Sequence, residues 1–174
     1  MSILSKIRLA KLYMRNHWNK KLVHICGNQH IFSKVIFEGT GYIGPNASIT
    51  GSGSVKIGDN TIIGPNVEIM TTVHNYDSEL LPYDSRQNIT KNIIIGRNVW
   101  IGSDVIIMPG VIIGEGSVIG AKSFVNKNIS KCSIVVGTPA KVIKKRNVEK
   151  YEELCKSNKL YLYKKYSLNS KEIR

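Results

Sequence analysis

The sequence predicts a mainly β domain of stacked coils with a helix at each end, and three observations support this prediction. A period of six residues, with an aliphatic residue in its first position, runs through most of the chain. Apolar residues recur at helical spacings of three and four near both ends. A length of 174 residues with 42% hydrophobic side chains is enough for one domain with a core.

The six-residue period is clearest from residue 95 onward, where the chain reads IGRNVW, IGSDVI, IMPGVI, IGEGSV, IGAKSF and VNKNIS. The first position is always aliphatic and β-branched: Ile95, Ile101, Ile107, Ile113, Ile119 and Val125. A short strand followed by a tight turn gives this period, because the aliphatic residue points inward and Gly, Asn or Asp adopts the turn. Three such segments would close one triangular coil, and stacked coils would bury columns of Ile and Val. Six consecutive hexads in one frame argue against a chance pattern.

The same frame continues upstream with one slip and is then interrupted. It holds at Ile31, Phe37, Ile43 and Ile49, slips by two residues near Gly51–Ser54, and resumes at Ile57, Ile63 and Ile69. The interruption is TTVHNYDSELLPYDSRQNITKN, which ends at Asn92. A polar insertion between hexads predicts a loop over 75–92 that protrudes from the coils.

Residues at both ends are spaced as in helices. An apolar stripe opposed by bases predicts an amphipathic basic helix over 1–22, and its members are Ile3, Ile7, Ala10, Met14, Trp18 and Leu22. Val148, Tyr151 and Leu154 predict a short helix in a basic C-terminal tail, 145–174. Both helices are expected to pack against the β domain, 23–144. For the first helix, association with an anionic membrane or a partner enzyme is the alternative.

The net charge of +13 is concentrated at the two ends. Residues 1–22 hold six Lys or Arg and no acid, and 141–174 hold eleven Lys or Arg and four Glu. Residues 23–140 hold eight bases and eight acids. Basic ends can meet anionic lipid, a polyanionic glycan or a phosphorylated cofactor. The neutral repeats lack a basic groove with interleaved aromatics, so we expect no nucleic-acid partner.

Absent motifs exclude several classes of protein. No run of 18 apolar residues predicts a membrane span, and bases interrupt the N-terminus too often for a signal peptide. Three widely spaced cysteines favour a reducing cytoplasm over disulfides. The chain has no Walker loop, dinucleotide fingerprint or nucleophile elbow. A three-histidine zinc site is not expected, because only His74 of the four histidines lies in the regular repeats beside a loop. We therefore predict no metal.

His74 stands where the repeat stops, and it is the candidate catalytic residue. It closes the hexad that begins at Ile69, so a coil edge should hold its backbone. A polar loop follows, and functional residues often lie on loops held by a rigid scaffold. Imidazole changes charge near neutral pH and can accept a proton from a hydroxyl. A lone histidine is more often structural than catalytic, so the hypothesis depends on this position.

Residues 42–144 resemble a known family. The motifs are IGDNTIIGPNVEI, a histidine after TTV, IGRNVWIGSDVIIMPGVIIGEGSVIGAKSFV and VVGTPAKVIKK, in that order. They are similar to hexapeptide-repeat acyltransferases, most closely the galactoside- and maltose-type sugar O-acetyltransferases, with polysaccharide-acetylating relatives. The resemblance implies a left-handed parallel β-helix, acetyl-CoA as co-substrate without a metal, and a homotrimer with active sites between subunits. The handedness rests on this resemblance, because it breaks the usual right-handed crossover rule.

The resemblance also implies roles for single residues, beginning with His74 as the catalytic histidine. The cofactor-binding positions fall on Trp100, Ser103, Ala121, Asn126, Lys127, Lys141 and Lys144. Among these, the Ser103 backbone N–H would face the thioester, and Ala121 would lie along the pantetheine arm. Small residues let such an arm lie close to the backbone, and lysines match the phosphate charge at its far end.

The acceptor site departs from the family pattern. The galactoside-type enzymes carry an acceptor-binding asparagine upstream of the histidine, and the ungapped position here is Gly44, with Asn46 nearby. Their N-terminal acidic residue has no counterpart, because residues 1–22 lack Asp and Glu. The expected acceptor-binding residues are therefore Asn46 and, from the loop, Tyr76, Asp77, Tyr83 and Arg86.

These residues predict an acetyl-CoA-dependent O-acetyltransferase. His74 would deprotonate a sugar hydroxyl, and the Ser103 N–H would stabilise the oxyanion. The basic ends favour an acidic capsule or lipopolysaccharide glycan, or its precursor, as the acceptor. Two alternatives stay open: N-acetylation of an amino sugar, and a non-catalytic β-helical binding protein. The expected setting is the bacterial cytoplasm, with peripheral contact at the inner face of the membrane.

Overall fold

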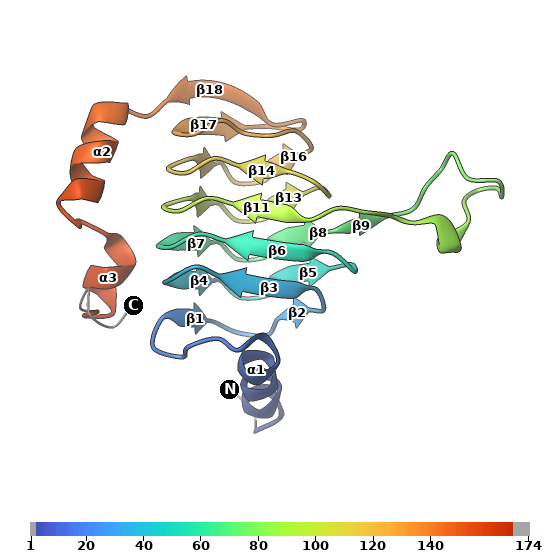
Figure 1. Ribbon diagram of the computed structural model, residues 1–174, viewed down its shortest axis with the longest axis horizontal. Helices are drawn as coiled ribbons and strands as arrows, with labels where there is room; N and C mark the ends of the chain where they lie inside the picture. Colours follow the sequence, from blue (N-terminus) through green and yellow to red (C-terminus); the bar gives the residue numbers. More distant parts are fainter. Residues whose placement is uncertain (1–2, 169–174) are drawn as a thin grey trace.

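The computed structural model describes residues 3–168 as a parallel β-helix with one helix at its base and two helices along one side (Figure 1). Residues 1–2 and 169–174, parts of the predicted N-terminal helix and C-terminal tail, lie outside the described residues. The helices are α1 (Ile3–Asn16), α2 (Val148–Lys156) and α3 (Tyr161–Lys165), and one 3₁₀ turn, η1 (Ser85–Gln87), lies in the loop. The prediction of a parallel β-helix with terminal helices is confirmed.

Three sheets of parallel strands form the three faces of the β-helix. Face A consists of β1 (Val23–Ile25), β4 (Gly41–Ile43), β7 (Thr61–Ile63), β12 (Trp100–Ile101), β15 (Val118–Ile119) and β17 (Ser133–Val136). Face B consists of β2 (His30–Ile31), β5 (Ser48–Thr50), β8 (Glu68–Met70), β13 (Ile106–Ile107) and β16 (Phe124–Val125). Face C consists of β3 (Lys34–Phe37), β6 (Ser54–Ile57), β11 (Ile93–Ile95) and β14 (Ile112–Ile113).

The chain passes from face A to B to C in each coil, so the prism has three edges. Coils 1 to 5 begin with β1, β4, β7, β12 and β15. The AB edge holds the turns 44–47, 64–67, 102–105 and 120–123. The BC edge holds 51–53, 71–92, 108–111 and 126–128, and the CA edge holds 38–40, 58–60, 96–99 and 114–117.

Aliphatic side chains fill the interior in vertical columns. On face A, Ile43, Ile63, Ile101 and Ile119 lie in register on successive coils and are at most 1% exposed. These are the first positions of the predicted hexads, and the side chains next to them point outward. Burial of an aliphatic side chain in nearly every hexad on all three faces is the main stabilising contribution to this fold.

The turns explain the Asn and Asp residues of the repeat. On the AB edge, φ is 58° at Asn46, 56° at Asn66 and 57° at Asp104. Asn and Asp adopt this left-handed conformation more readily than branched residues. Their side chains also form a ladder, because Asn46 Nδ2 donates to Asn66 Oδ1 at 3.3 Å and Asn66 Nδ2 donates to Asp104 Oδ1 at 3.1 Å.

The predicted loop leaves the BC edge between β8 and β11 and extends away from the prism (Figure 1). Its two ends form a short antiparallel hairpin of β9 (Thr72–Val73) and β10 (Ile89–Thr90). The hairpin therefore holds the base of the loop at coil 3.

The C-terminal tail returns along the CA edge. Strand β18 (Lys141–Lys145) pairs antiparallel with β17 at the top, and α2 and α3 then run down the side (Figure 1). Asn98 Nδ2 donates to Tyr151 Oη at 3.2 Å, and Asn60 Oδ1 accepts from the Leu162 N–H at 2.9 Å. Tyr166 stacks on His24 of coil 1 with ring centroids 3.4 Å apart. The tail thus links the upper coils to the lowest one.

The N-terminal helix differs from its prediction in length and orientation. It ends at Asn16 because His17 takes a φ of 55°, so Trp18 and Leu22 are not helical. Trp18 is instead buried under coil 1, where its Nε1–H donates to Val35 O at 3.0 Å. The expected packing stripe was wrong, since Ile7 is 48% and Met14 66% exposed. The side that packs on the core contains Leu9, Leu12 and Tyr13.

Candidate active site

The AB edge presents backbone N–H groups at Ser103 and Ala121 that donate no hydrogen bond within residues 3–168. In coils 2 and 3 the residue after the turn glycine is Pro45 or Pro65, which has no N–H. In coils 4 and 5 the same position is Ser103 or Ala121, and neither N–H donates a hydrogen bond within residues 3–168. Both residues are small, so a ligand can approach these donors at the middle of this edge.

Close packing between coils leaves no room for a side chain at the turn glycine of this edge. A Cβ on Gly102 would lie 2.7 Å from Ala121 N, which is too close for any side chain. Glycine is therefore required immediately before Ser103, and the two donors of neighbouring coils stay stacked. Such a surface suits a long flexible ligand that lies along the backbone.

The BC edge carries His74 at the base of the loop. His74 follows β9 directly and is exposed. Its Nδ1 lies 2.8 Å from Asn88 Oδ1, and its ring stacks on Tyr83 with centroids 3.8 Å apart and planes at 13°. Within residues 3–168, Nε2 has no hydrogen-bond partner. One ring nitrogen is therefore held and the other is free.

The far part of the loop is organised by Asp84. This carboxylate is buried and accepts from the Arg86 guanidinium at 3.0 Å (Nε) and 2.8 Å (Nη2). The Arg86 side chain holds the pKa of Asp84 below its usual range. Ser78 Oγ accepts from the Asp84 N–H at 2.7 Å. Arg86 thus has a structural partner already, whereas Tyr76 and Asp77 are exposed.

The predicted site residues fall into separate groups. Ser103, Ala121 and the exposed Asn46 share the AB edge. His74 shares the BC edge with Asn126 and Lys127, which follow β16 two coils higher. Face B separates these edges, so a single chain does not bring His74 and Ser103 together.

The remaining basic residues lie on the top strand. Lys141 pairs with Val136 at the AB end of β17, above Ala121, and Lys144 pairs with Ile134 further toward the CA edge. Both lysines are exposed. The AB edge thus continues from Ser103 through Ala121 to Lys141.

Trp100 is placed apart from both edges. It starts β12 on face A and is 57% exposed. It lines a groove of about 200 Å³ with Tyr151 and Tyr161 of the C-terminal helices. The structure therefore places Trp100 beside the tail.

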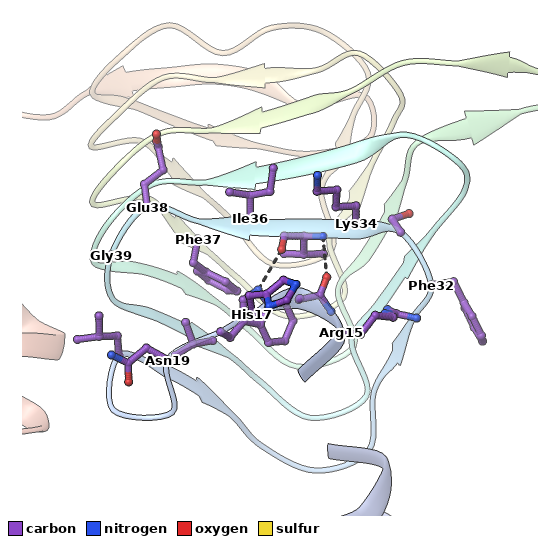
Figure 2. Close-up of a pocket in the computed structure, with 15 residues that line it drawn as sticks. Arg15, His17, Asn19, Phe32, Lys34, Ile36, Phe37, Glu38 and Gly39 are labelled. Atoms are coloured by element: carbon purple, nitrogen blue, oxygen red, sulfur yellow. Dashed lines mark hydrogen bonds between the residues drawn. The ribbon is translucent and has the colours of Figure 1, made fainter. Parts of the chain in front are cut away.

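A groove of about 780 Å³ lies elsewhere (Figure 2). It lies at the base between the end of α1 and β3, and Arg15, Phe32, Phe37 and Glu38 are among its lining residues. His74 is not among them.

Metal ligands do not cluster in this structure. Within residues 3–168, no group of three or more His, Cys, Asp or Glu side chains could hold an ion. The same part of the chain contains no helix with the length and apolar character to cross a membrane.

Sequence reasoning missed Asn88, the partner of the His74 ring. The residue lies in a loop without a period, where spacing gives no information. The flanking residues TTVH and NIT could have predicted a hairpin, because a ladder that pairs Val73 with Ile89 puts His74 opposite Asn88.

Known proteins share this architecture and parts of this sequence. A family model described as "Bacterial transferase hexapeptide (six repeats)" matches residues 92–127. A maltose O-acetyltransferase from Clostridium difficile 630 is 35% identical over 72% of this chain and 67% of that chain, with a TM-score of 0.62. A galactoside acetyltransferase in complex with coenzyme A is 31% identical over 84% of this chain and 83% of that chain, with a TM-score of 0.56.

A third relative acts on a different kind of group. It is a variant of an N-acyltransferase from Bacillus cereus, in complex with dTDP-4-amino-4,6-dideoxyglucose and coenzyme A. Its identity is 26% over 78% of this chain and 77% of that chain, with a TM-score of 0.68. Because the maltose O-acetyltransferase and the galactoside acetyltransferase are 35% and 31% identical to this chain over 67% and 83% of their own lengths, the chain belongs to the hexapeptide-repeat acyltransferases and is an acetyltransferase of that family.

Proposed function

We propose that this protein transfers the acetyl group of acetyl-CoA to a hydroxyl of a sugar or glycan. The observation that carries the proposal is the exposed His74 imidazole at the base of the loop, held through Nδ1 with Nε2 free. A base of this kind can accept the proton of an attacking hydroxyl. The similarity to maltose and galactoside acetyltransferases supports a sugar acceptor.

In the proposed mechanism, His74 acts as general base and then as general acid. Nε2 takes the proton from the acceptor hydroxyl while its oxygen forms a bond to the acetyl carbonyl carbon. As the carbon–sulfur bond breaks, the imidazolium returns that proton to the departing thiolate. The proposed reaction needs no metal. The thiolate is a good leaving group, and His74 alone transfers the proton from the acceptor hydroxyl to the thiolate.

The Ser103 backbone N–H is the proposed donor to the carbonyl oxygen. Negative charge develops on that oxygen during attack, and a fixed donor stabilises it without reorganisation. The N–H of Ser103 is unpaired within the described residues, as this role requires. Acetyl-CoA fits the bare AB edge, where Ala121 would hold its pantetheine arm.

The phosphate end of the coenzyme would lie near the top of the prism. Lys141 continues the AB edge above Ala121, and Asn126 and Lys127 face the same level from the BC edge. Lys144 lies further away and would act at longer range, and Trp100 would contribute only where the ligand reaches face A. Exposed lysines at the end of a narrow neutral edge match the charge distribution of a nucleotide-linked thioester.

We propose a closed homotrimer in which neighbours complete each active site. The AB and BC edges are the two borders of face B, so rotation of three chains about an axis facing this sheet brings the AB edge of one against the BC edge of the next. His74 of one subunit would then meet Ser103 of its neighbour. Proximity across this cleft would supply much of the rate.

The loop and the lower AB edge are the proposed acceptor region. Asn46 lies below Ser103 on the AB edge, and Tyr83 lies against the His74 ring. Tyr76 and Asp77 are exposed further out on the loop, and Arg86 would bind an acceptor only beside its Asp84 partner. The basic termini favour an acidic glycan or its precursor.

The nature of the acceptor group tests this proposal. The full chain is incubated with acetyl-CoA and a panel of neutral and acidic glycans, each with hydroxyls only or with one free amine. We expect thiol release and an acetylated product with the hydroxyl-only acceptors, and we expect hydroxylamine to remove the acetyl group because it cleaves esters. Turnover confined to amine acceptors, with hydroxylamine-stable products, would contradict this proposal. It would support N-acetylation of an amino sugar, the alternative suggested by the N-acyltransferase from Bacillus cereus.

We also propose peripheral contact between the base of the protein and an anionic membrane. The outer side of α1 exposes Ile7 and Met14, and Phe32 beside Arg15 is 71% exposed (Figure 2). Residues 1–37 contain seven Lys or Arg and no acid. Exposed apolar side chains among bases favour the surface of anionic lipid. A cytoplasmic location at the inner face of a membrane stays a prediction on this basis.

Vesicle sedimentation tests the membrane contact. We expect the full chain to bind vesicles that contain anionic lipid. High salt should abolish this binding, because the attraction of each basic residue, about 1 kcal/mol near the surface, is screened. The double variant Ile7→Glu, Met14→Glu should also lose binding, because it replaces the exposed apolar side chains with acids. The matched control is Ile112→Glu, an exposed isoleucine on face C. Equal binding to neutral vesicles, or unchanged binding of the double variant, would contradict the proposal.

A further inference from the structure

The hairpin at the base of the loop determines which residue faces His74. Its ladder pairs Thr72 with Thr90 and Val73 with Ile89. The next position on each strand is His74 and Asn88, so these residues are cross-strand neighbours by register. The Thr72 and Thr90 hydroxyls are 2.8 Å apart and strengthen the same hairpin. The position of Asn88 against the imidazole is thus built into the backbone.

Two contacts fix the imidazole on this hairpin. Asn88 Oδ1 lies 2.8 Å from Nδ1, and the Tyr83 ring lies flat against the imidazole. An amide oxygen only accepts, so the hydrogen bond places the proton on Nδ1. The lone pair is then on Nε2, which has no partner within residues 3–168. The tautomer that this contact selects is the one that can accept a proton at the free nitrogen.

We propose that Asn88 is a positioning residue that holds His74 in the Nδ1–H tautomer with Nε2 as the basic atom. This inference rests on the proposed function of His74. A base needs a partner that orients it, and carboxylates often serve in that role. Asn88 is neutral, and no ion pair of the described residues includes His74. Asn88 therefore orients the ring without placing a negative charge beside it.

Because the partner of His74 is neutral, its identity should affect the pH dependence of activity. A hydrogen bond that only stabilised the hairpin would have no such effect. A carboxylate at the same place would favour the imidazolium, so the base would be lost to protonation at a higher pH. Asparagine adds no such charge. The identity of residue 88 thus affects the pH range of activity as well as the rate.

Three variants of the full chain separate positioning from hairpin stability. Asn88→Leu removes the acceptor, and we expect kcat to fall on the order of 10- to 100-fold with an unchanged KM for acetyl-CoA. Asn88→Asp keeps the acceptor, and we expect kcat to recover at high pH while the acid limb of the kcat/KM profile moves to higher pH. Thr90→Val removes the neighbouring hairpin hydrogen bond, and we expect near wild-type rates. Equal losses in Asn88→Leu and Thr90→Val, or an Asn88→Asp profile without a shift, would overturn the proposal.

Nitrogen-15 spectra of the imidazole test the tautomer without any turnover. At a pH where His74 is neutral, we expect the wild-type ring to carry its proton on Nδ1 and Asn88→Leu to lose this preference, with signals assigned by their absence in His74→Ala. A proton on Nε2 in the wild type would overturn the inference. If His74→Ala still turns over while the spectra show the Nδ1–H form, the proposed general-base function fails and the positioning of the ring by Asn88 stands.

Discussion

Replacing His74 with Ala is expected to lower kcat for acetyl transfer by about 10²- to 10⁴-fold, the range that a general base contributes. The reason is that no other imidazole lies on the BC edge, so the acceptor hydroxyl would lose its proton only to water. The KM for acetyl-CoA should stay within about twofold, because the proposed cofactor contacts are on the AB edge and at the top. Thiol release under saturating acetyl-CoA measures both quantities.

The structure also gives a control for this substitution. His74 is exposed, so its loss should leave the melting temperature almost unchanged. His17→Asn replaces another exposed histidine far from the loop, at a position whose φ of 55° suits asparagine, and should keep full activity. If His74→Ala turns over at the wild-type rate, His74 is not the base. If it fails to bind acetyl-CoA as well, His74 acts in binding rather than in proton transfer.

The fold could be predicted because the first position of each hexad points into the core. A residue such as Ile101 meets Ile63 below and Ile119 above, and a polar or small side chain there would open the column. The turns impose a second constraint, since Gly102 has no room for a Cβ and Asp104 has a positive φ. Both constraints are local and repeat with the coil, so they are readable in the sequence.

The candidate site could be predicted only in part, because its residues lie in segments with different sequence patterns. Ser103 and Ala121 follow the repeat, where they occupy the position that Pro45 and Pro65 take in lower coils. His74 marks the place where the repeat stops. Asn88 follows neither pattern, since its contact with His74 depends on the register of a hairpin inside an aperiodic loop.

The N-terminal helix shows why periodicity alone does not give orientation. Ile7 and Met14 form a stripe as regular as the one that packs, which includes Leu9 and Leu12. The packed side is selected by contacts that lie far away in sequence, such as the hydrogen bond from the Tyr13 hydroxyl to Val23 O. Sequence spacing predicted a helix with an apolar face but not which of two faces the coils would cover.

Replacing Ile113 with Ala is expected to lower the free energy of unfolding strongly. Ile113 of coil 4 is fully buried. In the face C column it lies between Ile95 of coil 3 and Ile129 of coil 5. Removing its outer carbons leaves a cavity that the stacked backbones cannot close, which costs about 2–5 kcal/mol. For a chain of this size each kcal/mol lowers the melting temperature by roughly 2–4 °C, so calorimetry at fixed protein concentration should show a clear shift.

Ile112→Ala is the matched control, because it alters the adjacent residue of the same two-residue strand. Ile112 points outward and is 44% exposed. Strand propensity and the ladder hydrogen bonds change in the same way in both variants, so the difference between their melting temperatures isolates the cost of the cavity. We expect Ile112→Ala to cost less than about 1 kcal/mol. Equal losses would mean that face C is covered in the assembled protein, and a small loss for Ile113→Ala would contradict the account of a core that cannot collapse around a missing side chain.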